Sequence, residues 1–108
     1  LKDNQIKIIN EIKSIVNQNN TIILSFDVIF HLVEDTVYKE HLDFINSTNA
    51  NYCLVVSTDK HVNYDYSKPH VRHRNYSKDL KLNGWKFLDS KKIIKCQDKR
   101  EIKLFQRD

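Results

Sequence analysis

Two short, almost unbroken apolar runs most constrain the fold of this chain. They are "TIILSF" (residues 21–26) and "NYCLVVST" (residues 51–58), and a segment with helical spacing lies between them. Runs of this kind are typical of strands that are buried on both faces of a parallel sheet. A strand, a helix and a second strand in this order form the parallel crossover unit. The sequence therefore predicts an α/β fold built around such a unit.

Helices are predicted on both sides of the first run. After it, a helix is expected to begin at Glu34 or Asp35, where acidic side chains suit the helix dipole. The apolar stripe of this helix consists of Val37, Tyr38, His41, Leu42 and Ile45. Before the run, residues 1–20 carry a second helical pattern, with apolar side chains at Ile8, Ile12, Ile15 and Val16.

The rest of the chain predicts a long loop, a short helix and a hairpin. Residues 59–74 are polar, aromatic and rich in histidine, and loops of this length are often functional. A short helix is expected over residues 77–82, and Gly84 is placed to end it. The segments "GWKFLDSKKII" and "REIKLFQRD" are predicted strands, and their short connection suits an antiparallel hairpin.

Composition narrows the class of protein. A chain of 108 residues buries one modest core, so a single domain is expected. The net charge of +4 is mild and fits either surface lysines or an anionic partner.

Cys53 and Cys96 lack zinc-ligand spacing, Cys53 is expected in the core, and no metal site is predicted. Without a recognisable signal peptide or spanning segment, we expect a cytoplasmic protein with no membrane partner. The absence of Met suggests a fragment or a processed chain.

Two motifs carry a resemblance to a known family. They are "LSFDVIFHLVED" (residues 24–35) and "PHVRHR" (residues 69–74), the second followed by "NYSKDL" and "GWKF". Over roughly residues 21–105 the chain resembles the C-terminal half of a class I S-adenosylmethionine-dependent methyltransferase. In that family a similar motif ends the fourth strand, beside the methionine moiety of the donor. A helix, the fifth strand, an acceptor-side loop and a hairpin with the antiparallel seventh strand follow.

This resemblance implies a partial Rossmann-like methyltransferase sheet. It consists of the strand–helix–strand unit and a C-terminal antiparallel hairpin, with a helix over residues 1–20 and the matched region over 21–108. One departure from the family is large. The family binds its donor with a glycine-rich turn after the first strand and an acidic residue after the second, whereas the only glycine here is Gly84. The chain by itself is therefore not expected to bind S-adenosylmethionine in the usual way.

The resemblance implies a cofactor site at the end of the first predicted strand. Ser25, Phe26 and Asp27 would line the methionine end of the pocket for S-adenosylmethionine. Asp27 and His31 are the catalytic candidates, because methyl transfer needs positioning, and an acceptor with a proton to lose needs a base near neutral pH. The alternatives are structural: Asp27 caps the turn after the strand, and His31 bonds to backbone at the start of the helix.

The basic loop supplies candidates for binding the methyl acceptor. His70, Arg72 and His73 lie close together, and a guanidinium binds carboxylate or phosphate with two hydrogen bonds. The alternative is a solvated loop, or an ion pair with Asp59 or Asp65. An aromatic lid over the site would consist of His61, Tyr64 and Tyr66.

Two classes of function follow from these patterns. The first is an enzyme: the acceptor-side half of a methyltransferase, acting on an unknown small or polymeric acceptor, with the glycine turn supplied by a longer chain or a partner. The second is a non-catalytic methyltransferase-like module that binds a protein or RNA. A metal-dependent nuclease would need an acidic pair and a lysine on adjacent strands, and no such set is present. Because half of the sheet would be missing, we expect the chain to form a homodimer, to dock on a partner chain or to use its N-terminal helix as a cover.

Overall fold

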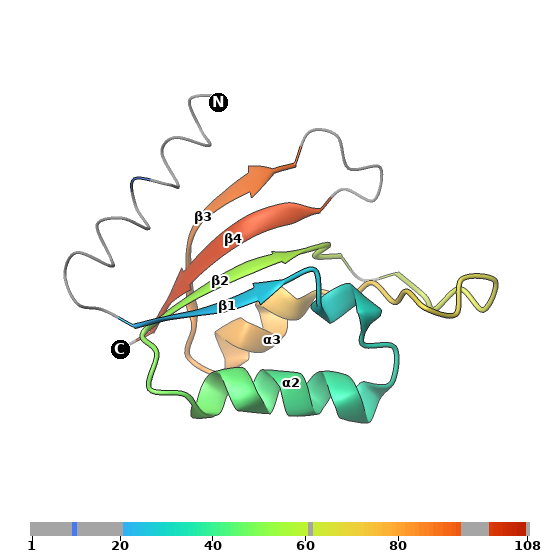
Figure 1. Cartoon of the computed structure of the whole chain (residues 1–108), viewed down its shortest axis with the longest axis horizontal. Coiled ribbons are helices and arrows are strands. Elements are labelled where there is room, and N and C mark those ends of the chain that lie inside the picture. Colours follow the sequence, from blue (N-terminus) through green and yellow to red (C-terminus); the bar gives the residue numbers. More distant parts are fainter. Residues whose placement is uncertain (1–9, 11–20, 61, 94–99, 108) are drawn as a thin grey trace.

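The computed structural model describes residue 10 and residues 21–60, 62–93 and 100–107. In this part of the chain the fold is mixed α/β, with a four-stranded sheet, two α-helices and one short 3-10 helix. The elements are β1 (Ile22–Phe26), η1 (Ile29–His31), α2 (Asp35–Ser47), β2 (Tyr52–Ser57), α3 (Tyr76–Leu82), β3 (Lys86–Lys92) and β4 (Glu101–Gln106) (Figure 1). Apart from Asn10, the helix predicted over residues 1–20 lies outside the described residues. None of the described helices is long and apolar enough to cross a membrane.

The strands are arranged in the order β1-β2-β4-β3. β1 and β2 are parallel and are connected through η1 and α2, so the predicted crossover unit is confirmed. β4 is antiparallel to both of its neighbours, β2 and β3, which confirms the predicted hairpin. The last strand of the chain is thus inserted between the second and third strands.

Both helices pack on the same face of the sheet (Figure 1). The core between these layers includes Tyr38, Leu42 and Ile45 from α2, together with Cys53, Trp85 and Phe105. Cys53 is therefore a core residue, as predicted, Trp85 is buried beside it in the same core, and burial raises the pKa of the Cys53 thiol to about 12. The predicted stripe of α2 is wrong at Val37. This side chain is 40% exposed in the first turn of the helix, because it lies beside the buried line of Tyr38, Leu42 and Ile45 and not on it.

The prediction that both apolar runs are buried on both faces holds for one of them only. In β2, the consecutive residues Cys53, Leu54 and Val55 are all buried. In β1, by contrast, Leu24 and Phe26 are 55% and 50% exposed. Leu24 and Phe26 lie on the face of the sheet that the two helices do not cover. In addition, within the described residues β1 has a strand neighbour on one side only.

Two local features fix the ends of the helices. Gly84 has a φ of 90° after α3, and its N–H donates to the carbonyl of Lys81 at 3.1 Å, so the predicted glycine stop is confirmed. At the end of α2, the guanidinium of Arg107 donates to the carbonyls of Asn46, Thr48 and Ala50. The same guanidinium lies 4.4 Å from the ring of Trp85, so Arg107 joins the end of the chain to the last turn of α2.

Candidate functional site

Polar side chains gather where the parallel strands end. Asp27 follows β1, Thr58 follows β2, and Arg100 precedes β4, which runs in the opposite direction and so begins at the same edge of the sheet. A guanidinium nitrogen of Arg100 lies 3.0 Å from a carboxylate oxygen of Asp27. The guanidinium also lies 5.7 Å from the centre of the Phe30 ring. We call this set the rim.

The backbone at Asp27 is unusual as well. Its φ of 56° lies in the left-handed region, which aspartate tolerates better than most residues other than glycine. Its N–H donates to the carbonyl of Val56 at 2.8 Å, extending the pairing of β1 with β2 by one residue. Asp27 therefore shapes the turn between strand and η1, while its carboxylate remains 47% exposed at the rim.

The three residues predicted to bind the cofactor point in different directions, because side chains alternate along a strand. Ser25 is only 3% exposed and faces α2, where its hydroxyl lies 2.9 Å from Nε2 of His41. Phe26 is half exposed on the opposite face of the sheet. Of the three, the structure thus places only Asp27 in the polar contacts of the rim.

His31 and His70 come together beside the rim. His31 is exposed on η1, and its Nδ1 lies 3.4 Å from the carbonyl oxygen of His70. Both residues line a groove of about 450 Å³ that continues over Pro69 and Val37. The two catalytic candidates therefore have separate contacts: His31 meets His70, and Asp27 meets Arg100.

The arginines of the loop bind the start of α2. A guanidinium nitrogen of Arg72 lies 3.0 Å from the carboxylate of Asp35, and one of Arg74 lies 3.2 Å from the same oxygen. Both guanidinium groups also donate to the carbonyl of Val33. The alternative pairing of the loop with Asp59 or Asp65 is thus wrong for Arg72.

Arg74 is the more deeply placed of these two arginines. It is 8% exposed, and its guanidinium lies 4.3 Å from the ring of Tyr38. Burial lowers the pKa of the Arg74 guanidinium. Its Nη2 contacts Val33 and Asp35 at the start of α2, so Arg74 stabilises the loop against this helix, and Arg72, whose side chain is 31% exposed, is the more accessible cation of the two.

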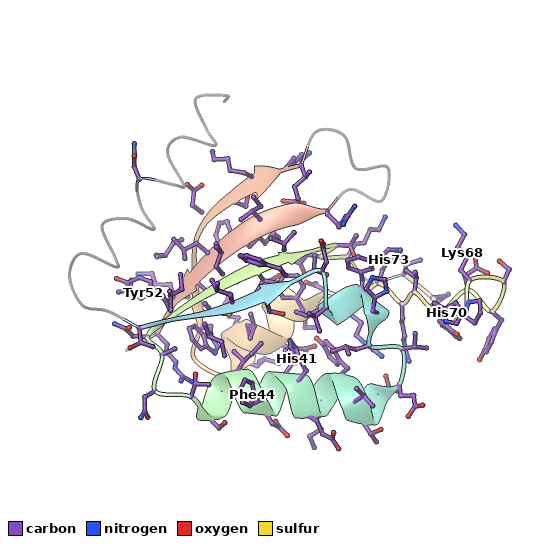
Figure 2. All side chains as sticks on the ribbon, viewed as in Figure 1. His41, Phe44, Tyr52, Lys68, His70 and His73 are labelled. Carbon is purple, nitrogen blue, oxygen red and sulfur yellow. The ribbon has the colours of Figure 1, made fainter. Side chains whose placement is uncertain are left out.

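The two described histidines of the loop, His70 and His73, differ in how close they lie to the sheet. Figure 2 shows His70 far out on the loop, whereas His73 lies close to the sheet. Nδ1 of His73 lies 2.7 Å from the hydroxyl of Thr58, and its ring stacks on Phe30 with the centres 6.5 Å apart. Arg72 and His73 line one cavity of about 480 Å³, and His70 lines the separate groove with His31. The structure therefore divides the predicted acceptor residues between two hollows.

The predicted lid is formed only in part. Tyr64 and Tyr66 make an edge-to-face contact with their ring centres 4.8 Å apart, and His61 lies outside the described residues. Tyr64 lines the cavity beside Arg72, while Tyr66 is 85% exposed. Among the described residues, no group of three His, Cys, Asp or Glu side chains is placed to hold a metal ion.

The residues that sequence reasoning missed come from distant elements. Arg100 and Asp35 were not among the candidates, yet they pair with Asp27 and with Arg72. One signal could have identified Arg100. It begins a segment that was already predicted to be an antiparallel strand, so the amino end of that strand returns to the rim. Asp35 had no such signal, because its partner is 37 residues away across a loop.

No family model, curated protein or solved structure matches this chain. The methyltransferase resemblance therefore stays an expectation that rests on the two sequence motifs.

Proposed function

We propose that this chain is the acceptor-side half of an S-adenosylmethionine-dependent methyltransferase with a Rossmann-like sheet. The observation that carries the proposal is the topology. A parallel crossover unit is followed by a last strand, β4, which is antiparallel and lies between β2 and β3. Such an antiparallel last strand is the feature that the resemblance predicts. A cytoplasmic location is part of the same proposal.

The rim supports a role in binding the methionine end of the donor. That end is an amino acid, with a positive ammonium group and a negative carboxylate on one carbon. Asp27 and Arg100 present the two opposite charges next to each other, and the side chains are 47% and 28% exposed. An amino acid could replace each partner of this ion pair with its own oppositely charged group. Ser25 and Phe26 would then support the strand rather than contact the donor's charged groups.

The groove beside the rim is where the methyl acceptor would bind. His31 is an exposed imidazole at the end of η1 and lines the groove with His70. In the proposed reaction His31 accepts the proton that the acceptor loses, because a neutral imidazole nitrogen can act as a general base. Arg72 and His73 line the separate cavity and would hold the loop of His70 in place, since they contact Asp35 and Thr58.

The donor's ribose and adenine would be bound by residues outside this chain. The only glycine is Gly84, which ends α3, so no glycine-rich turn is available here. A longer chain or a partner chain would complete the site by pairing with β1, which has one strand neighbour within the described residues. The missing glycine turn is also the observation that favours the second candidate, a non-catalytic module that binds a protein or RNA.

The test is an NMR titration of the isotope-labelled chain with S-adenosylhomocysteine, methionine and methionine methyl ester. We expect amide shifts confined to residues 26–31 and 100–101, with dissociation constants of about 1 mM for the first two ligands. The methyl ester should bind more weakly, because it lacks the carboxylate to which Arg100 would donate.

Two variants make this test specific. Asp27→Asn keeps the left-handed turn but removes the charge, and it should abolish the shifts caused by all three ligands. The matched control, Asp43→Asn, changes an exposed carboxylate on α2 and should leave them unchanged. A folded chain that shows no shifts, or shifts that Asp27→Asn does not alter, would contradict a donor site at the rim.

A further inference from the structure

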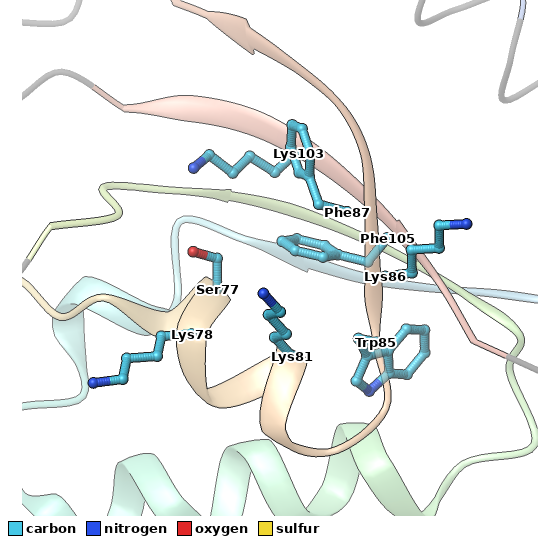
Figure 3. Close-up of a pocket in the computed structure, with 8 residues that line it drawn as sticks. All are labelled: Ser77, Lys78, Lys81, Trp85, Lys86, Phe87, Lys103 and Phe105. Carbon is cyan, nitrogen blue, oxygen red and sulfur yellow. The ribbon is translucent and has the colours of Figure 1, made fainter.

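A second site lies away from the rim, between α3 and the β3–β4 hairpin. Here a pocket of about 520 Å³ is lined by three aromatic side chains, Trp85, Phe87 and Phe105 (Figure 3). We call it the α3–β3 pocket. It shares no lining residue with the groove of His31 or the pair of Asp27 and Arg100. An inference about it therefore does not depend on the proposed methyltransferase function.

The aromatic residues form a floor and an accessible wall. Trp85 and Phe105 are each 1% exposed, so they close the bottom of the pocket. Phe87 is 51% exposed, and its ring makes an edge-to-face contact with Phe105, with centres 6.0 Å apart. The exposed ring of Phe87 is consequently held at a fixed angle by a buried neighbour. A ring fixed in this way offers a flat surface on which another planar group can stack.

The other lining residues make the pocket positive. Four are lysines, namely Lys78, Lys81, Lys86 and Lys103, and none of the described residues that line it is acidic. Lys103 is bound to Asp59 at 2.6 Å, so its charge is largely neutralised. Lys81 and Lys86 are exposed, and within the described residues neither forms an ion pair. Figure 3 shows the side chain of Lys81 next to Phe105, whereas the side chain of Lys86 extends from β3 to the side away from Phe87.

We propose that the α3–β3 pocket binds a nucleotide, with the base stacked on Phe87 and the phosphate next to Lys81. An aromatic surface bordered by ammonium groups matches a ligand that is planar at one end and anionic at the other. Lysine binds phosphate as a point charge and needs no second hydrogen bond, unlike arginine. Aromatic stacking combined with basic side chains is also how proteins bind unpaired nucleotides of single strands. Two kinds of ligand have this chemistry: a free nucleotide, and a nucleotide within a single strand.

The fluorescence of Trp85 provides a direct readout, because Trp85 is the only tryptophan of the chain and lines the pocket. The full chain is titrated with AMP, with ATP and with a single-stranded oligouridylate, and an acidic polyglutamate peptide is the charge control. We expect nucleotides to change the emission with saturation, and the peptide to leave it unchanged. Equal affinity for AMP and the oligonucleotide would assign a free nucleotide; tighter binding of the oligonucleotide, weakening steeply with salt, would assign a single strand.

Variants separate stacking from charge. Phe87→Ala should weaken nucleotide binding about tenfold, the loss expected for one stacked base. The control Phe44→Ala removes a ring that is 63% exposed on the outer side of α2, and it should have no effect. Lys81→Gln should weaken binding severalfold, whereas Lys86→Gln, whose side chain points away from Phe87, and Lys39→Gln on α2 should not. The proposal is overturned if a folded chain binds no nucleotide, if polyglutamate binds equally well, or if Phe87→Ala and Phe44→Ala behave alike.

Discussion

The hydroxyl of Ser25 lies 2.9 Å from Nε2 of His41, and this contact ties the inner face of β1 to α2. His41 lies between α2 and the sheet (Figure 2). Burial lowers the pKa of this imidazole, because a charged ring is poorly solvated there. The strand end that was predicted to line a ligand pocket thus also holds a polar contact of the core.

His41 makes stability depend on pH. In the unfolded chain its pKa is near the ordinary value of about 6.5, and folding lowers it, so the unfolded state binds the proton more readily. The free energy of unfolding should therefore fall as the pH drops below about 6.5. Urea denaturation at several pH values measures this. In His41→Gln, which can still bond to Ser25, the dependence should be weaker, whereas His70→Gln, at an exposed position, should keep it. The same dependence in His41→Gln would exclude His41 as its source.

The left-handed turn at Asp27 predicts an order of stability among variants. Glycine adopts a φ of 56° without strain, and aspartate and asparagine tolerate it, but alanine does not. The ion pair with Arg100 is partly exposed and contributes about 1 kcal/mol or less. We expect Asp27→Asn and Asp27→Gly to stay close to the wild type, and Asp27→Ala to lose about 1–2 kcal/mol of unfolding free energy. Chemical denaturation followed by circular dichroism decides this, and equal losses for alanine and glycine would refute it.

Arg107 should contribute more to stability than its place near the end of the chain suggests. Its guanidinium donates to three carbonyls at the end of α2 and stacks on Trp85. A lysine cannot reach all three acceptors, so Arg107→Lys should cost about 2 kcal/mol. Arg100→Lys is the matched control, because a lysine can still pair with Asp27 and should cost less than about 0.5 kcal/mol. If thermal and urea unfolding show similar losses for the two variants, the carbonyl contacts are not what stabilises this end of α2.

The outer face of β1 predicts association. Leu24 and Phe26 are half exposed on the face away from the helices, next to a sheet edge that has no strand neighbour among the described residues. Open edges and apolar faces of this kind pair with other chains. Light scattering should show a mass that rises with concentration between about 5 and about 500 µM, because association follows mass action.

Variants on the two faces of the chain test the origin of this association. Phe26→Lys should shift the mass toward the monomer, and Phe44→Lys, at an equally exposed position on α2, should not. A wild-type chain that stays monomeric throughout would mean that no second copy completes the sheet.

Local pattern was sufficient for most of the described elements, although η1, between β1 and α2, was not predicted. Period and turn chemistry predicted β1, α2, β2, α3 and the hairpin, because each depends on neighbours along the chain: apolar runs make buried strands, and Gly84 permits the turn that ends α3. The direction of β4 followed in the same way from a short connection. Burial was predicted wrongly at Val37 and on the outer face of β1. At these positions burial depends on which other element packs against the side chain.

The candidate site shows the same division more sharply. The order of residues was enough to place Asp27 and His31 after the first strand and a basic loop after the second. It did not reveal that Asp27 pairs with Arg100, that Arg72 and Arg74 share Asp35, or that Ser25 turns inward to His41, because these contacts exist only in the folded chain. These partners lie far apart in the chain. The distance between their charged or polar groups is set by how the strands are ordered and how the loop packs, and no local spacing encodes that.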